Sequence, residues 1–500
     1  MSSLKSLLSL HRIPHHLRNL STAHTEKKSG DISNAFASLS GLEFKPLDPR
    51  FADIKTSLLS GHEEAITSSW ARLLNALEEE IPLITSLGSN SIPTIDYPSI
   101  TNPSETFRSE LRKRGVAVIR NVIPEGEALS LKRELKDYIA ANPHTRAFPP
   151  ENPQVYELYW STAQTKARAH PRLLAAQKFL MSVWNSRSKS TVSTAHPTMY
   201  ADRLRMRLPG DSRFALGPHV DGGSCERWEK RGYGLGGVYD AIFSGRWEEY
   251  DPWEASCRVP VVSDLYSGVG ACSMFRMFQG WLALSEVGPF EGTLLVNPLL
   301  RHATAYFLLR PFFEPIRADP AGDGFLKPAN WRLERETSAW LQGATPGHGQ
   351  ELRDALHPHL KVDLPVLGWE GKSSMVHVLR VRPGDYVAWH CDTIHAVDGV
   401  HAGKADSSVM YIPTCPLTVQ NAAFLKRQRE AFLSGRPCPD FGGGVGESGH
   451  VGHATVDDVE MMNPEEGMRA FGLKAWNVNE KGLSSAQREL LTRANEVLGF

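Results

Sequence analysis

Two histidines and one aspartate stand in an order that suits a metal ion. His219 and Asp221 are two positions apart, and His390 or His395 supplies a second imidazole much later in the chain. Two imidazoles and one carboxylate form the facial ligand set of non-haem Fe(II), which leaves coordination positions open for reactants. The motif alone is weak evidence, because 19 histidines in 500 residues should give roughly one His-x-Asp pair by chance. Its surroundings must therefore decide.

The first two ligands lie in a favourable setting. Residues 217–223 read Gly-Pro-His-Val-Asp-Gly-Gly and follow residues 200–208, whose apolar and charged side chains alternate as in a strand. This alternation puts His219 and Asp221 on one face, so both side chains can reach one ion. The glycines that follow permit a close approach of backbone or ligand. The context therefore favours this pair over the looser His-x-Glu matches near the N-terminus.

The second imidazole has two candidates. A Pro-Gly-Asp turn at 383–385 precedes an apolar strand at 386–389, which would deliver His390 or His395 to the mouth of a β-rich core. We favour His395, because it lies beyond the strand, where the chain can turn inward. His390 is then a supporting group or a core histidine. Taken singly, each of these histidines is more often hydrogen-bonded within a core than bound to a metal.

The bulk composition narrows the class of protein. The chain is 41% hydrophobic and 22% charged with a net charge of −1, so no excess of basic residues indicates a nucleic-acid partner. Six cysteines without Cys-x-x-Cys spacing argue against a disulfide framework or a structural zinc site. No apolar run approaches the ~18 residues of a membrane span. We expect a soluble globular protein that acts on a small molecule, and the oligomeric state stays open.

Residues 1–30 differ in kind from the rest of the chain. The first 25 residues are rich in serine and leucine, contain basic residues, and include neither aspartate nor glutamate. This composition is typical of a mitochondrial transit peptide, and a disordered cytosolic tail is the equal alternative. A mitochondrial and a cytoplasmic location are therefore both expectations, and whether the segment is cleaved stays open.

Hydrophobic periodicity divides the remainder into three parts. Residues 31–112 form a helical N-terminal extension. Residues 113–418 carry short strand candidates punctuated by glycine and proline, with insertions near 228–258 and 311–350. Residues 419–500 form a helical C-terminal extension. Helices are predicted at 62–84, 105–114, 125–141, 419–433 and 484–498, and strands at 200–208, 292–297, 303–309, 375–381 and 386–389. The predicted fold class is a mainly β core with helical additions.

Several segments resemble a known group of enzymes. Residues 383–395, with their Pro-Gly-Asp turn, strand and His-x-x-x-x-His ending, look like the distal segment of phytanoyl-CoA-dioxygenase-like proteins. Residues 114–120 and 292–298 are similar to the opening and the mid-barrel strand of those enzymes. Residues 201–207 and 217–223, with Arg227-Trp228, more closely resemble a fungal and bacterial branch catalogued as domain of unknown function 1479. The resemblance covers roughly residues 100–440.

This resemblance implies a double-stranded β-helix, a cupin-like jelly roll, that holds Fe(II) and uses 2-oxoglutarate and O2. It implies His219, Asp221 and His395 as the metal ligands. The expected activity is that of a Fe(II)/2-oxoglutarate-dependent dioxygenase, which hydroxylates a small-molecule substrate and releases succinate and CO2. A cupin-type metal enzyme without 2-oxoglutarate, or a non-catalytic binding protein on the same fold, is the alternative. The resemblance names no substrate.

The sequence departs from that group at the residue that holds the far carboxylate of 2-oxoglutarate. Such enzymes usually place an arginine shortly after the second metal-binding histidine, often followed closely by a serine, yet no arginine lies between His395 and Arg427. Lys404 and Ser408 are candidates, although a lysine offers a point charge instead of a bidentate fork. Arg205, on the earlier strand, is the other candidate. Its same-face neighbours Arg203 and Arg207 would need carboxylate partners if this face is buried and none if it is exposed.

Overall fold

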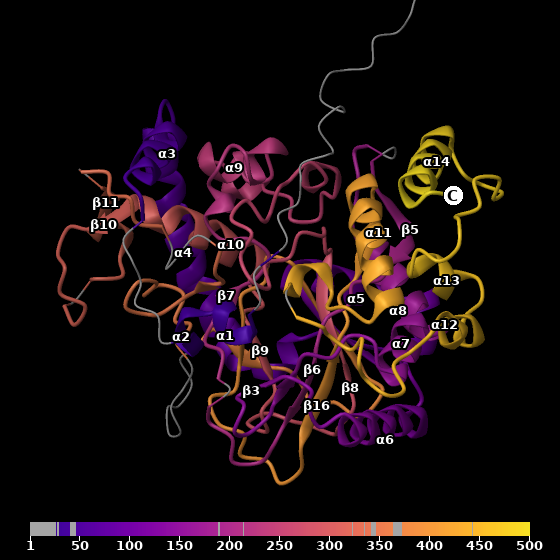
Figure 1. The fold of residues 1–500 in the computed structure, drawn as a ribbon. Coiled ribbons are helices and arrows are strands. Elements are labelled where there is room, and N and C mark those ends of the chain that lie inside the picture. The colour runs from indigo at the N-terminus through magenta and orange to yellow at the C-terminus, as the bar shows by residue number, and fades with distance from the viewer. Residues whose placement is uncertain are drawn as a thin grey trace, which may run out of the picture.

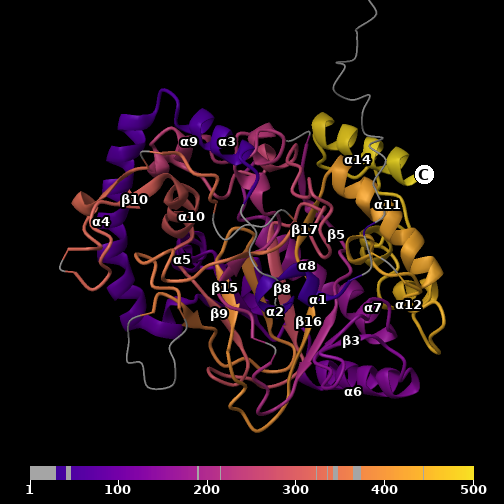
Figure 2. The ribbon, with the colours of Figure 1, turned by 60° about the vertical axis from the view of Figure 1, so that its left-hand side comes forward.

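Two β-sheets form the centre of the molecule. The computed structural model describes residues 27, 30–40, 47–188, 191–213, 215–322, 324–334, 336–341, 347–363, 373–442 and 444–500. The helices at 50–59 and 63–87 lie on one side of the sheets, and the helices after residue 418 lie on the other, together with those at 125–181 (Figures 1 and 2). The eight-stranded sheet has the order β1-β2-β14-β8-β16-β6-β4-β3, and the five-stranded sheet has the order β12-β7-β15-β9-β13. Only the β1–β2 pair in these two sheets is parallel.

The elements have the following bounds. The eight-stranded sheet contains β1 (Thr94–Asp96), β2 (Val116–Arg120), β3 (Ala147–Phe148), β4 (Val155–Tyr156), β6 (Leu204–Arg207), β8 (Phe278–Ala283), β14 (Tyr386–His390) and β16 (Ser407–Tyr411). The five-stranded sheet contains β7 (His219–Val220), β9 (Leu294–Val296), β12 (Gln350–Glu351), β13 (Val376–His377) and β15 (His395–Val397). Two further pairs are β5 (Ser193–Thr198) with β17 (Cys415–Leu417), and β10 (Phe313–Pro315) with β11 (Trp331–Leu333). The α-helices are α1 (Ile32–Ala35), α2 (Ala37–Ser40), α3 (Arg50–Leu59), α4 (Glu63–Leu87), α5 (Glu105–Arg114), α6 (Glu125–Ala141), α7 (Thr162–Ala169), α8 (Pro171–Met181), α9 (Asp240–Phe243), α10 (Leu300–Leu309), α11 (Val419–Ser434), α12 (Val456–Met462), α13 (Glu466–Ala470) and α14 (Ser485–Leu498).

The chain passes repeatedly from one sheet to the other. The strands β6, β8 and β14 lie in the eight-stranded sheet, and the strand that follows each of them, β7, β9 or β15, lies in the five-stranded sheet. This alternation makes β7 and β15 hydrogen-bonded neighbours although they are far apart in the sequence. The expected combination of strands with flanking helices is present as a mixed α/β fold, and within the described residues neither sheet closes into a barrel.

The helices predicted from hydrophobic periodicity are confirmed as α4, α5, α6, α11 and α14. In α4 the buried side chains recur at three- and four-residue steps and pack on α10 and on the β10–β11 pair. The ring of Trp70 stacks on Phe313 with centroids 4.4 Å apart and on Tyr306 with centroids 5.1 Å apart. Packing of the apolar stripe thus fixes this helix beside the sheets.

The strand predicted at 303–309 is wrong, because these residues belong to α10. All seven side chains of this run are buried, so the run lacks an alternating pattern. A short apolar run of this kind cannot be assigned to a buried strand or a buried helix by periodicity alone. The other predicted strands overlap β6, β9, β13 and β14.

Most of the predicted transit peptide or tail at 1–30 lies outside the described residues. Its cleavage and the location of the protein stay predictions, and nothing in the structure supports a mitochondrial location. Within the described part of the chain, no helix has the length and apolar character required to span a membrane.

A buried carboxyl group joins the C-terminal extension to the rest of the fold. Glu447 accepts hydrogen bonds from the backbone N–H groups of Tyr159 and Trp160 at 2.6 and 2.8 Å, and from the hydroxyl of Tyr138 at 3.1 Å. Burial raises the pKa of Glu447 from its ordinary 4.5 to about 7, against these hydrogen bonds. The folded protein therefore binds a proton here over a range in which the unfolded chain has released it.

We expect Glu447→Gln to remove one pH dependence of stability. Because the folded-state pKa is the higher one, the contribution of Glu447 is fully present below pH 4.5 and is lost as the pH rises through about 7. The free energy of unfolding of the variant, relative to that of the wild type, should therefore rise by up to about 3 kcal/mol as the pH rises across this range. Urea unfolding at pH 5 and pH 8 checks this. A difference that does not change with pH contradicts it.

Candidate metal centre

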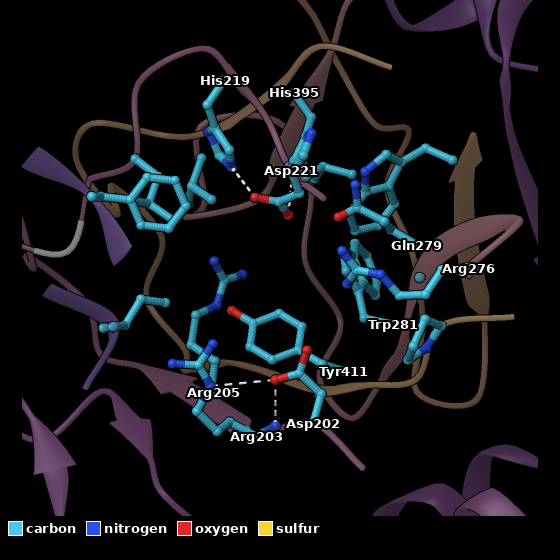
Figure 3. A pocket seen from close by; sticks show the side chains of 18 residues that line it. Asp202, Arg203, Arg205, His219, Asp221, Arg276, Gln279, Trp281, His395 and Tyr411 are labelled. Atoms are coloured by element: carbon cyan, nitrogen blue, oxygen red, sulfur yellow. Dashed lines mark hydrogen bonds and ion pairs between the residues drawn. The ribbon is translucent and has the colours of Figure 1, made fainter. Parts of the chain in front are cut away.

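The structure brings His219, Asp221 and His395 together at the ends of two neighbouring inner strands of the five-stranded sheet. His219 begins β7 and His395 begins β15, and the two residues are register partners with ring centroids 4.2 Å apart. Asp221 follows β7, and its carboxylate lies between the two imidazoles (Figure 3). Gly222 and Gly223 then turn the chain with φ angles of +75° and +111°, which explains the glycines of this segment.

The ligand atoms of the triad converge. Asp221 Oδ1 lies 3.6 Å from His219 Nε2, and Asp221 Oδ2 lies 3.5 Å from His395 Nε2. The Nδ1 atom of His219 is 2.7 Å from the Gly217 carbonyl oxygen, and that of His395 is 3.0 Å from the Thr393 carbonyl oxygen. Donation to these carbonyls fixes the tautomer and leaves each Nε2 lone pair directed at the shared space.

The protonation states also suit a metal. Burial, helped by the neighbouring His395, lowers the pKa of His219 to about 4, so this imidazole is neutral near neutral pH. Burial alone would raise the pKa of Asp221, but the adjacent His395 and His219 hold it below its usual range. Metal ligands about 2.1 Å from one ion and at right angles lie ~3 Å apart, close to the distances observed here. The triad therefore fits a facially bound divalent metal.

A cavity of about 100 Å³ adjoins the triad. The residues that line it are Ile32, Phe36, Asp202, Arg203, Arg205, Leu216, His219, Asp221, Arg276, Gln279, Gly280, Trp281, Leu294, Trp389, His395, Val397, Tyr411 and Pro413. Gln279 Nε2 and Trp389 Nε1 are buried and have no hydrogen-bond partner among the described residues. Buried donors of this kind call for an acceptor. The cavity wall thus offers donors to the oxygen atoms of a bound ligand.

Arg203, just before β6, and Arg205 and Arg207 within it are all buried. Arg207 Nε donates to Asp211 at 2.7 Å, and Arg203 Nε lies 3.3 Å from Asp202. Arg205 donates to the Gly292 carbonyl oxygen at 3.3 Å, and its side chain extends into the cavity from the side opposite the triad (Figure 3). The Arg205 guanidinium therefore forms the part of the cavity wall that β6 provides opposite the triad.

The other two cosubstrate-binding candidates lie elsewhere. Lys404 is exposed to solvent, and it does not line the cavity. Ser408 is buried, and its register partner on β6 is Met206, so its side chain lies on the opposite face of the sheet from Arg205. The Ser408 hydroxyl bonds to Asp406. The structure thus brings Arg205 into the cavity that the triad adjoins and leaves Lys404 and Ser408 outside it.

His390 is a core residue in this fold. Its Nε2 is 2.9 Å from the Pro252 carbonyl oxygen, its Nδ1 accepts from the Asp392 N–H at 3.0 Å, and its ring stacks on Trp184 at 4.7 Å. His390, Cys391 and Asp392 form a second group with metal-ligand chemistry. However, Asp392 is already bound by Tyr239, Tyr250 and Arg258. We interpret this second group as structural.

We expect Arg258→Met to destabilise the fold strongly. The Arg258 and Asp392 side chains are only 3% and 2% exposed, so the variant leaves a buried carboxylate without its counter-charge. Removing one partner of a buried ion pair typically lowers the free energy of unfolding by about 3–5 kcal/mol. Denaturant titration measures the change. The exposed Arg317, replaced by glutamine, is the control and should change stability by less than about 0.5 kcal/mol.

Sequence reasoning missed Arg276, Gln279, Trp389 and Tyr411 as cavity residues. Trp389 lies in the strand of the 383–395 segment but is not one of its ligand positions, and the other three belong to no recognisable motif. Gln279 and Trp389 are register partners on β8 and β14, so only knowledge of the strand pairing could have placed them on one face.

A mixed α/β fold with a His-Asp-His cluster beside a cavity lined by both charged and apolar side chains defines a candidate metal-binding protein. The chain belongs to the Gig2-like family, whose sequence model matches residues 45–473. YbiU of Escherichia coli (strain K12) is 31% identical over 409 residues, which are 79% of this chain and 88% of that protein. The crystal structure of GlcNAc Inducible Gene 2 from Candida albicans, a protein that carries the label DUF1479, matches with a TM-score of 0.79 and 31% identity over 91% of this chain and 96% of that chain. A solved protein from Salmonella typhimurium LT2 matches with a TM-score of 0.73 and 29% identity over 86% of this chain and 99% of that chain.

Proposed function

We propose that this protein is a non-haem Fe(II)- and 2-oxoglutarate-dependent oxygenase that hydroxylates a small molecule. The observation that carries the proposal is the convergence of His219 Nε2, His395 Nε2 and the Asp221 carboxylate, which all lie within 4.8 Å of one another. Two imidazoles and one carboxylate on one face are the ligand set of such oxygenases.

The sheet topology supports the finer fold assignment. In the eight-stranded sheet β6, β16, β8 and β14 are consecutive neighbours, and in the five-stranded sheet β7, β15, β9 and β13 are. With the chain alternating between these two groups, we assign them as the two sheets of a double-stranded β-helix. The metal ligands then come from the β7 and β15 strands of one sheet, and the cosubstrate residues come from the other.

The cavity offers the contacts that a 2-oxo acid needs. Arg205 supplies a bidentate fork for the far carboxylate of 2-oxoglutarate, and it lies on β6 beside Val409 of β16. Gln279 Nε2 and Trp389 Nε1 supply donors for the cosubstrate's remaining oxygen atoms. When bound, Fe(II) with 2-oxoglutarate and O2 supplies the oxidising chemistry that hydroxylates a C–H bond and yields succinate and CO2.

The surrounding side chains keep the centre dry and ordered. Phe36 packs edge-on against the His219 ring at 4.8 Å, and the Trp389 ring lies 5.1 Å from that of His395. The carbonyls of Gly217 and Thr393 hold both imidazoles in orientation. These contacts fix the ligands before a metal arrives, which lowers the reorganisation that binding requires.

The test is succinate formation from 2-oxoglutarate by anaerobically purified, Fe(II)-loaded protein, with His219→Ala as the control. We expect one bound iron per chain and slow succinate formation without added substrate, both lost in the variant. A wild type that binds iron but yields no succinate and shows no absorbance change with 2-oxoglutarate favours a cupin-type metal enzyme without this cosubstrate. A wild type that binds no iron excludes the proposal.

A further inference from the structure

Arg276 lies at the junction of two cavities beside the metal centre. It lines the cavity that faces the triad, and also a recess of about 60 Å³ that Asp221 lines as well. A Cβ built on Gly222 would be 3.6 Å from Arg276 Nη2, so the guanidinium lies directly beside the residue that follows Asp221. Figure 3 shows Arg276 on the wall next to Gln279, apart from Arg205. Its side chain is partly exposed, unlike that of Arg205.

The guanidinium of Arg276 has unused hydrogen-bonding capacity. Within the part of the chain that the structure describes, no carboxylate oxygen lies within 4 Å of it and no hydrogen bond from it is formed; its contact is with the face of the Tyr200 ring, 5.7 Å from the guanidinium carbon. An arginine carries five N–H donors in a fixed fork that matches a carboxylate. A partly buried fork on a cavity wall is therefore a site for an anionic ligand.

The charge balance of the cavity leaves room for one anion. The described charged groups that line it are Arg203, Arg205 and Arg276 against Asp202 and Asp221, with one positive charge in excess. Fe(II) and fully ionised 2-oxoglutarate carry opposite charges of equal size, so they leave this excess unchanged. A carboxylate would neutralise it, whereas a phosphate monoester carries about −1.5 to −2 at pH 7 and would overshoot.

We propose that Arg276 binds a carboxylate group of the substrate, and hence that the substrate is a small carboxylic acid. This rests on the proposed function, which assigns Arg205 to the cosubstrate. Arg205 is 3% exposed and lies on an inner strand, whereas Arg276 borders both the metal centre and the second recess. An acid held by Arg276 extends from that recess towards the triad, with its reacting carbon next to the open side of the centre.

The probes are fluorinated carboxylic acids of graded size, each paired with its primary amide and its phosphonate analogue. Binding is measured by 19F NMR on protein loaded with Fe(II) and 2-oxoglutarate under argon, and again on metal-free protein. We expect at least one acid to bind at least about tenfold more tightly than its amide, the effect of one charge-assisted contact. Arg276→Gln should abolish this preference, Arg276→Lys should keep part of it, and Arg317→Gln, which alters an exposed arginine, should leave it unchanged.

The proposal fails if no acid is preferred over its amide, if Arg276→Gln keeps the preference, or if phosphonates bind better than acids. It also fails if Arg276→Gln loses uncoupled succinate formation with an unchanged melting temperature, since Arg276 would then hold the cosubstrate. Failure of the proposed function has a different signature, because a wild type without iron or succinate can still show, in metal-free form, whether Arg276 selects carboxylates.

Discussion

Replacing His395 by alanine will abolish Fe(II) binding, whereas replacing His390 by alanine will leave it intact. His395 Nε2 faces Asp221 across 3.5 Å, so its loss leaves two ligands that cannot hold iron on one face. Both nitrogens of His390 are engaged with backbone groups, Nε2 with the Pro252 carbonyl oxygen and Nδ1 with the Asp392 N–H. The measurement is iron per chain after anaerobic loading and desalting, with a colorimetric chelator. We expect about one iron for His390→Ala and less than about a tenth for His395→Ala.

The order of the two variants should be reversed for stability, where His390→Ala should be the more damaging substitution. His390 is fully buried, and its ring stacks on Trp184 at 4.7 Å, so truncation leaves a cavity and two unsatisfied backbone groups. We expect His390→Ala to lower the free energy of unfolding by about 2–4 kcal/mol. His395 faces the metal cavity, and its truncation should lower the stability of the metal-free protein by less. Iron lost in His390→Ala and kept in His395→Ala would overturn the ligand assignment.

The local part of the candidate metal site could be predicted from the sequence. The two glycines after Asp221 are a short-range feature, and both lie in the turn that follows β7. The strand itself covers only His219 and Val220, so Asp221 lies just beyond it and still meets the two imidazoles. The choice between His390 and His395 was harder, because both follow one strand within a few residues. It depends on β15 pairing with β7, a contact between segments far apart in the chain. No local pattern encodes that pairing.

Apart from Arg205, the rest of the cavity depends on long-range register and could not be predicted from the sequence. Lys404 was a candidate because of its distance after His395 along the chain, but that loop position is solvent-exposed. Arg276 precedes β8 without any motif, and its position beside Gly222 follows only from the folded chain. The wrong prediction of a strand at 303–309 also reflects a missing long-range contact. An apolar run without a period can form a strand or a helix, and its packing against other elements, here α4, decides between them.

Arg205→Gln will raise the KM for 2-oxoglutarate, and Lys404→Gln will leave it unchanged. Arg205 reaches the cavity from β6, while Lys404 is exposed on the loop before β16. Removing one partner of a buried charge-assisted pair costs about 2–5 kcal/mol, so we expect a rise in KM of at least about 30-fold. Succinate formation at graded 2-oxoglutarate concentrations measures it. Iron binding should stay at the wild-type level in both variants, because neither residue contacts the triad.

The variant Arg205→Lys tests whether cosubstrate binding depends on the charge of this residue alone or also on the planar geometry of its guanidinium. A lysine keeps the positive charge but offers no planar pair of donors, so KM should fall between those of the wild type and Arg205→Gln. An unchanged KM in Arg205→Gln, together with a raised KM in Lys404→Gln, would require the loop at 402–406 to fold over the cavity when the cosubstrate binds. Equal, large rises in Arg205→Gln and Arg276→Gln would instead mean that both arginines hold 2-oxoglutarate, which would leave the substrate without a cationic partner on the cavity wall.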